Sequence, residues 1–174
     1  MFLATTAEEQ GLLGSEYYAT TPILPLVDAV ADINIDTLNV HGRTTDVTNV
    51  GEGTDGASDL DGYLRAAAAE QHREVRADPE PEKGHYYRSD HFSFAKRGVP
   101  ALDAEGGVLF AGKGPEYGRD VRTMYLEHAY HKPADEVGDD WDLSGAIEDL
   151  ELLTAVGYRV AQAEAPPEIG RAHV

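Results

Sequence analysis

The sequence contains no cysteine and few basic residues, and each shortage excludes a class of function. With no cysteine among 174 residues, disulfide bonds and thiolate metal sites are impossible, so any metal must be held by histidine, aspartate or glutamate. Lysine and arginine together number 14, against 32 acidic residues, which gives a formal net charge of −18. This charge argues against nucleic acid and against anionic membrane surfaces as partners.

Long apolar runs are missing as well. The chain contains no stretch of about 18 consecutive apolar residues, so the sequence predicts no membrane-spanning helix. It also contains no recognisable signal peptide. Hydrophobic residues nonetheless make up 41% of the chain, enough to form the core of one globular domain. We expect this domain to span residues 1–165, and we expect residues 166–174, which begin with two prolines, to form a frayed tail.

Strand-like and helix-like segments alternate along the chain. Residues 1–4 form a short apolar run typical of a buried strand, and residues 31–40 alternate with period two. Residues 58–73 have the apolar spacing of an amphipathic helix, with Ser58 as its expected N-cap. This alternation predicts a layered α/β fold. The other expected elements are strands at 46–50, 74–77 and 99–104, helices at 8–19, 89–97 and 142–163, and a glycine-rich loop over 106–124.

An acidic pair, Glu8 and Glu9, directly follows the first expected strand. The C-terminal ends of strands are the usual location of functional sites in α/β proteins. Neighbouring carboxylates repel each other, but a bound cation removes the repulsion, and one acid can then hold the metal while the other moves protons. The alternative is a solvated helix start, where acids interact favourably with the helix dipole. The pair by itself fits this alternative better.

Three further groups of polar residues follow the acidic pair, and each has a simple structural explanation. A turn cap explains Asp36, a helix N-cap explains Asp90, and a surface turn explains His131. The groups are Asp36 in the second expected strand, Ser89, Asp90 and His91 at the start of a short helix, and Tyr130, His131 and Asp135 in a loop.

Taken together, the four groups resemble the co-catalytic dizinc aminopeptidases of metallopeptidase family 28. This family also includes relatives of glutamate carboxypeptidase and glutaminyl cyclase. The segments that carry the resemblance, in order, are TTAEEQGLLGS, NIDTLN, YYRSDHFSFAKRGVPAL and YHKPADE. The resemblance implies a three-layer α/β sandwich around a mixed, mostly parallel sheet, of the phosphorylase/hydrolase-like type found in zinc peptidases.

The resemblance also implies a role for each residue of the metal site. Glu8 corresponds to the general base that takes a proton from the metal-bound water. Glu9 and His131 correspond to ligands of one zinc ion, and Asp36 to a ligand of the other. Carboxylate and imidazole ligands suit zinc where no thiolate is present, and two zinc ions about 3.5 Å apart can activate one water and polarise the scissile carbonyl.

Other residues are implied to surround this metal site. Tyr130 resembles a tyrosine that in some members donates a hydrogen bond to the oxyanion. Asp90 and His91 correspond to residues that line the pocket or contact the ligands, and Asp135 is implied to support the His131 loop. The implied substrate is a peptide with a free amino terminus, whose ammonium group suits an acidic pocket. The sequence does not indicate an oligomeric state.

The sequence departs from the family pattern at its amino-terminal end. In relatives, a histidine and a metal-bridging aspartate lie upstream of the acidic pair. We therefore expect the chain to be the C-terminal portion of a longer catalytic domain that lacks the first strands of the sheet. We expect it to hold at most one zinc ion, weakly, to have doubtful activity, and to be unstable or to aggregate when expressed alone.

Two other functions remain open at this point. A glutaminyl cyclase-like acyl transferase would share the fold and use one zinc ion. A non-catalytic binding domain would keep the fold after losing metal ligands, although the retained acidic pair, Asp36 and His131 argue against such decay. The parent protein could be secreted or periplasmic, which the sequence does not decide.

Overall fold

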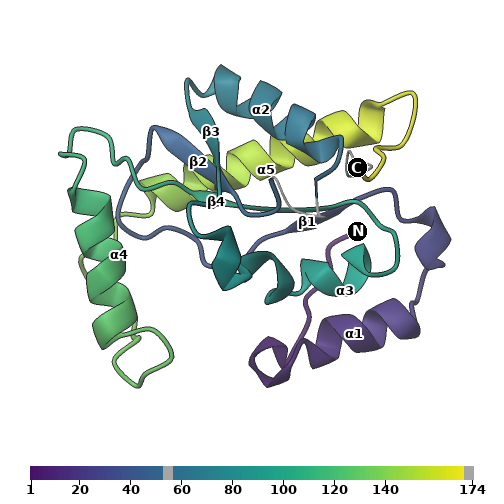
Figure 1. Ribbon diagram of the computed structural model, residues 1–174, viewed down its shortest axis with the longest axis horizontal. Coiled ribbons are helices and arrows are strands. Elements are labelled where there is room, and N and C mark those ends of the chain that lie inside the picture. Colours follow the sequence, from purple (N-terminus) through teal and green to yellow (C-terminus); the bar gives the residue numbers. More distant parts are fainter. Residues whose placement is uncertain (53–56, 171–174) are drawn as a thin grey trace.

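A mixed four-stranded sheet lies at the centre of the computed structural model, which describes residues 1–52 and 57–170 (Figure 1). Its strand order is β1-β4-β2-β3. β1 pairs with β4 and β2 with β3 in parallel, whereas β2 and β4 run antiparallel. The strands are Asp32–Asn34 (β1), Asp46–Asn49 (β2), Glu74–Ala77 (β3) and Ala101–Gly106 (β4).

Helices cover both faces of this sheet (Figure 1). Helices α2 (Leu60–Glu70) and α5 (Ser144–Gln162) pack on one face, and α3 (His91–Ala95) packs on the other, with α1 (Leu13–Thr20) outside it. The α/β sandwich expected from the sequence is therefore confirmed. Short 3₁₀ turns lie at Glu8–Gln10 (η1), Leu26–Asp28 (η2), Pro81–Lys83 (η3) and His85–Tyr87 (η4).

The main hydrophobic core lies between the sheet and helices α2 and α5. In α2, apolar residues recur at helical spacing, and Leu60 and Leu64 are completely buried. The helix begins at Leu60 and has Asp59 at its N-cap, one residue after the expected Ser58. The Leu60 N–H nonetheless donates a hydrogen bond to the Ser58 hydroxyl at 3.3 Å. Leu102 of β4 and Val156 of α5 complete the centre of this core. Because side chains alternate along a strand, Asp103 faces the opposite side, towards α3.

The expectation of a buried strand over residues 1–4 is wrong. These residues are exposed and form no strand, and Phe2 is fully exposed. A strand requires a hydrogen-bonded neighbour. Among the described residues no strand lies beyond β1, which forms the edge of the sheet. Hydrophobic sequence alone was therefore insufficient to make this segment a strand.

Three other expected elements differ from the structure. The helix expected over 8–19 is divided, because Gly11 and Leu12 adopt left-handed backbone angles between η1 and α1. The strand expected over 31–40 is reduced to β1. The glycine-rich loop expected over 106–124 contains the start of helix α4 (Tyr117–His128), which stands at the side of the sheet (Figure 1). A Cβ at Gly118 would lie 2.0 Å from the Val108 carbonyl oxygen, so this glycine permits close packing of the helix.

The carboxyl-terminal segment is held by backbone hydrogen bonds as far as Gly170. The Gly170 N–H donates to the Ala57 carbonyl at 2.8 Å, and the Asp59 N–H donates to the Glu168 carbonyl at 3.0 Å. Fraying was expected from residue 166, and residues 171–174 of that expected tail lie outside the described residues. The domain boundary at residue 165 stays a prediction. Within the described ranges, no helix has the length and apolar character needed to cross a membrane.

Candidate active site

The acidic pair lies in a tight turn that closes on itself. We call residues 5–14 the acid-pair turn. Ala7 and Leu12, on either side of the pair, adopt left-handed φ angles of 57° and 61°. The Gly14 N–H donates to the Thr6 carbonyl at 2.9 Å, and a Cβ at Gly14 would lie only 2.3 Å from that oxygen. The turn therefore holds Glu8 half-buried and leaves Glu9 exposed.

Glu9 meets the loop that follows helix α4. Its Oε1 lies 2.9 Å from Nε2 of His131, which is far away in the sequence. His131 itself has a left-handed φ of 56°, and the ring of Tyr130 stacks on its imidazole at a centroid distance of 3.8 Å. The fold thus places a carboxylate and an imidazole in direct contact at the surface.

Burial and nearby charges raise the pKa values of two residues beside this contact. Burial raises the pKa of Glu8, and the nearby charges of Glu9, Asp36 and Asp90 raise it further, while His131 acts in the opposite direction. Burial also raises the pKa of Tyr130, with smaller contributions from the two glutamates. Glu8 therefore binds a proton more readily than an ordinary glutamate does. Tyr130 keeps its proton at neutral pH and can donate a hydrogen bond.

Asp36 is held near the same place from the end of β1. Its Oδ1 accepts a hydrogen bond from the Thr37 N–H at 2.8 Å, and its Oδ2 accepts one from the Ser89 hydroxyl at 3.2 Å. Asn34 donates in turn to the Ser89 hydroxyl at 2.9 Å and to Asp103 at 3.2 Å. Asp36 acts on Glu8 through its charge, and the hydrogen bonds with Ser89 and Thr37 set its orientation.

His91 and Asp90 occupy different environments although they are adjacent. His91 is completely buried, with Nδ1 3.6 Å from Oδ2 of Asp103. Burial lowers the pKa of His91 and raises that of Asp103. Asp90 instead accepts a hydrogen bond from the hydroxyl of Thr5, at the entrance to the acid-pair turn. The structure therefore brings Asp90 to the acidic pair and leaves His91 in the interior.

Asp135 is connected to helix α4. It accepts a hydrogen bond from the Tyr125 hydroxyl at 2.9 Å, and the rings of Tyr125 and Tyr130 lie 5.8 Å apart. Burial, followed by this hydrogen bond, raises the pKa of Tyr125 to about 12. The loop that carries His131 is thus attached to α4 at both of its ends. No sequence motif points to Tyr125, which lies in the helix α4 that the sequence does not predict.

The side chains at this site are of the types that bind zinc, but too few of them lie together to form a complete zinc site. A carboxylate and an imidazole in contact, as in Glu9 and His131, are ligands that zinc accepts. Across residues 1–52 and 57–170, however, no three histidine, aspartate or glutamate side chains come together closely enough to hold a metal ion. The predicted roles of all the site residues stay predictions. Thr5 and Ser89, whose hydroxyls contact Asp90 and Asp36, had been assigned no role.

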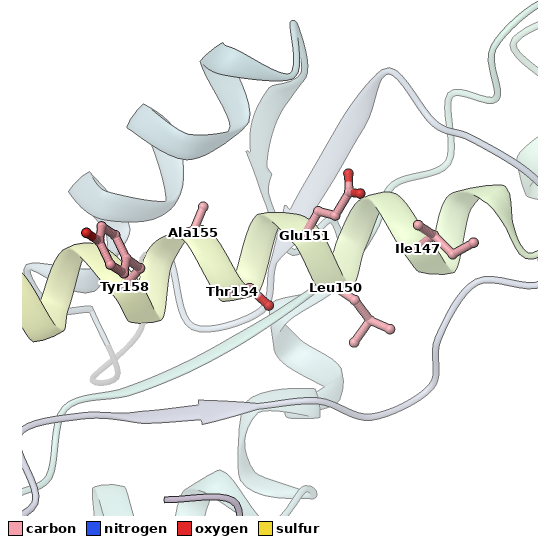
Figure 2. Close-up of a pocket in the computed structure, with 6 residues that line it drawn as sticks. All are labelled: Ile147, Leu150, Glu151, Thr154, Ala155 and Tyr158. Atoms are coloured by element: carbon pink, nitrogen blue, oxygen red, sulfur yellow. The ribbon is translucent and has the colours of Figure 1, made fainter.

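Two hollows lie away from the acidic pair. One, of about 400 Å³, lies between His41 and helix α4 and includes Tyr125. The other, of about 610 Å³, follows the outer side of α5, on the opposite face of the sheet from the acid-pair turn. Figure 2 shows its apolar side chains, among which Ile147 and Tyr158 are more than half exposed. Neither hollow contains a predicted site residue.

Comparison with known proteins gives a match to one family model and similarity to several solved structures, two of which are aminopeptidases. The model of peptidase family M28 matches residues 1–155. The LapA aminopeptidase of Legionella pneumophila has a TM-score of 0.58 at 20% identity, covering 92% of this chain and 38% of that chain. An aminopeptidase from Aneurinibacillus sp. strain AM-1 has a TM-score of 0.48 at 20% identity, covering 98% of this chain and 34% of that chain. The chain thus spans little more than a third of either structure's length. No curated protein matches the chain.

Proposed function

The chain belongs to peptidase family M28, and we propose from this that it carries part of the active site of a zinc-dependent aminopeptidase. Such an enzyme removes the N-terminal residue of a peptide. The observation that carries the proposal is the contact between Glu9 and His131, 2.9 Å apart, beside the half-buried Glu8. Two segments distant in the sequence are folded together there, and each brings a residue type that zinc peptidase chemistry needs.

Glu8 is the group that moves the proton in this proposal. Burial and nearby charges move the pKa of Glu8 towards neutral pH, and a base with such a pKa can both accept a proton and release it again. It would take a proton from water at Oε1 or Oε2 and pass it to the leaving amine of the peptide. Zinc, when bound, polarises the peptide carbonyl and lowers the pKa of a coordinated water to about 7.

The neighbouring residues bind and orient in this proposal. Tyr130, protonated at neutral pH, donates a hydrogen bond to the oxygen that becomes negatively charged. Glu9 and His131 would hold one zinc ion, and Asp36 would contribute to a second. The acidic side chains also attract the ammonium group of a peptide's free N-terminus. A catalytic zinc usually has three protein ligands, so we expect the two in contact here to bind it weakly.

Zinc titration of the 174-residue chain tests the metal part of the proposal. We expect calorimetry to show one weak site that is lost in Glu9→Gln and in His131→Gln. His128→Gln is the matched control, because His128 lies exposed at the end of α4 and next to an acid, Glu127, 3.9 Å away. Loss of zinc binding in the control, or unchanged binding in the two site variants, would refute the assignment.

A hydrolysis assay tests the reaction. The substrate is leucyl p-nitroanilide, with the N-acetylated compound as the control that an aminopeptidase should not cleave. Where the zinc-loaded chain turns the substrate over, Glu8→Gln should reduce the rate by about 10²–10⁴-fold, as expected for loss of a general base. Zinc binding without turnover would favour the non-catalytic binding domain. Conversion of a peptide with N-terminal glutamine, without hydrolysis of the anilide, would favour the acyl transferase.

A further inference from the structure

Helix α3 and the residue before it contact the chain on both sides of the acid-pair turn. At the entrance, the Thr5 hydroxyl donates a hydrogen bond to Oδ2 of Asp90. Beyond the exit, the Ser15 hydroxyl donates to the Ser93 hydroxyl at 3.0 Å, and both side chains are completely buried. The segment that carries the acidic pair is therefore attached to α3 before the pair and after it.

A third contact lies one helical turn further along. Glu16 of α1 pairs with Arg97 at 2.6 Å and with Lys96 at 2.9 Å. Hydrogen bonds from Arg97 and then Lys96 lower the pKa of Glu16 to about 2. The three contacts are made by residues just before, within and just after α3. Two of them hold the chain beyond the exit of the turn, and one holds its entrance. Thr5 and Asp90 make the side-chain contact on which the entrance depends.

The acid-pair turn needs such support because its backbone is not one that the residues would adopt freely. Ala7 and Leu12 have left-handed φ angles, which are unfavourable for residues with a Cβ and persist only where the surroundings impose them. The carboxylate of Asp90 also depends on Thr5, because its Oδ1 is buried and accepts no hydrogen bond from any described residue. Its charge acts on Glu8 as well.

We propose that Thr5 and Asp90 are positioning residues for the acidic pair, acting through the hydrogen bond between the Thr5 hydroxyl and the Asp90 carboxylate. This bond fixes the entrance of the acid-pair turn to the start of α3 and so sets where the carboxylates of Glu8 and Glu9 lie. The inference rests on the proposed function for the role of those carboxylates. The hydrogen bond and its effect on the turn can be measured without it.

Amide hydrogen exchange of the 174-residue chain tests the effect on the turn. The reporters are the N–H groups of Gly11, Leu12, Leu13 and Gly14, which close the turn through hydrogen bonds to residues 6–8. Thr5→Val removes the hydroxyl and keeps the shape of the side chain. We expect it to speed exchange at these amides about tenfold, the effect of losing one charge-assisted hydrogen bond. Thr5→Ser keeps the hydroxyl and should restore slow exchange.

Two controls separate positioning from general destabilisation. Thr20→Val makes the same chemical change at the end of α1, where the hydroxyl bonds only to its own helix, and should leave the reporter amides unchanged. In an Asp90→Ala background, Thr5→Val should have no further effect, because the acceptor is already absent. Unchanged exchange in Thr5→Val, equal exchange in Thr5→Ser and Thr5→Val, or additive effects of Thr5→Val and Asp90→Ala would overturn the proposal.

Zinc affinity provides a second measurement on the same variants. We expect Thr5→Val to weaken zinc binding at least tenfold and Thr5→Ser to bind as the wild-type chain does, since residues that orient ligands typically contribute about 10–100-fold. A wild-type chain that binds no zinc would refute the proposed metal site, while the exchange experiment would still decide the positioning role. Faster amide exchange with unchanged zinc affinity would show that Thr5 and Asp90 only stabilise the turn, and it would overturn their role in positioning the site.

Discussion

The buried ion pair between Arg73 and Asp149 offers the most specific test of the packing between the sheet and helix α5. Nη2 of Arg73 lies 2.7 Å from Oδ1 of Asp149, and the two side chains are only 2% and 4% exposed. The same nitrogen also donates to the Thr44 hydroxyl at 2.8 Å and to the Asp46 carbonyl at 3.0 Å. Replacing Arg73 by methionine keeps much of the side-chain volume and leaves Asp149 buried without its partner.

The magnitude follows from the fate of that carboxylate. Removing one partner of a buried pair costs about 3–5 kcal/mol. The chain can avoid a bare buried charge by protonating Asp149, whose pKa burial already raises. Protonation costs about 1.4 kcal/mol for each pH unit above the ordinary pKa of about 3.9, which limits the part of the loss caused by this charge to roughly 4 kcal/mol at pH 7 and about 1.5 kcal/mol at pH 5. The destabilisation of Arg73→Met should therefore shrink as the pH falls.

Urea unfolding followed by circular dichroism at pH 7 and pH 5 measures this difference. Arg159→Met is the matched control, because its pair with Glu70 (2.6 Å) involves side chains that are 27% and 69% exposed. Its loss should cost less than about 1 kcal/mol at either pH. The double variant Arg73→Met/Asp149→Leu should recover most of the lost stability. A loss below about 1 kcal/mol for Arg73→Met at pH 7, or one independent of pH, would refute this reasoning.

Two further predictions concern stability. Burial, with Asp103 nearby, raises the pKa of Asp32 to about 6 and that of Glu105 to about 7, so the folded chain holds these protons longer than the unfolded chain does. The free energy of unfolding should therefore fall as the pH rises from about 4 to 7, and Asp32→Asn should reduce the slope of urea-unfolding data; an unchanged slope would contradict this. Gly14→Ala should lower the melting temperature, because the added Cβ would lie 2.3 Å from the Thr6 carbonyl oxygen. Gly62→Ala in α2 is the control and should raise the melting temperature, because nothing lies within 4 Å of its added Cβ. Equal shifts of the two variants in scanning calorimetry would disprove the close approach at Gly14.

The structure confirms the expected elements whose hydrophobic pattern lies entirely within their own sequence and does not depend on a partner strand. The strand expected over 74–77 is β3 without change, and the helix over 58–73 contains α2, because its apolar residues recur on one face. Residues 1–4 were misjudged, since a strand depends on a partner that its own sequence does not specify. Helix α4 lies partly in the segment 106–124, whose many glycines predicted a loop, although Gly118 permits close packing of this helix.

The sequence by itself determined which residue types are available and in what order they occur. It excluded thiolate ligands and set the strongly acidic charge. Its motifs also indicated the peptidase family that the family model matches, while the roles predicted for Glu8, Glu9, Asp36 and His131 stay predictions. These properties belong to the covalent chain, so no folding is needed to know them. The alternation of strand-like and helix-like segments also indicated the α/β class, because hydrophobic periodicity is a local property of the sequence.

Only the tertiary structure decided which of these residues meet. It placed Glu9 against His131, turned His91 into the interior beside Asp103, and joined Thr5 to Asp90. Each of these contacts joins segments that are far apart in the chain. Their distance depends on the packing of α1, α3 and α4 around the sheet, a cooperative property that local propensity does not encode.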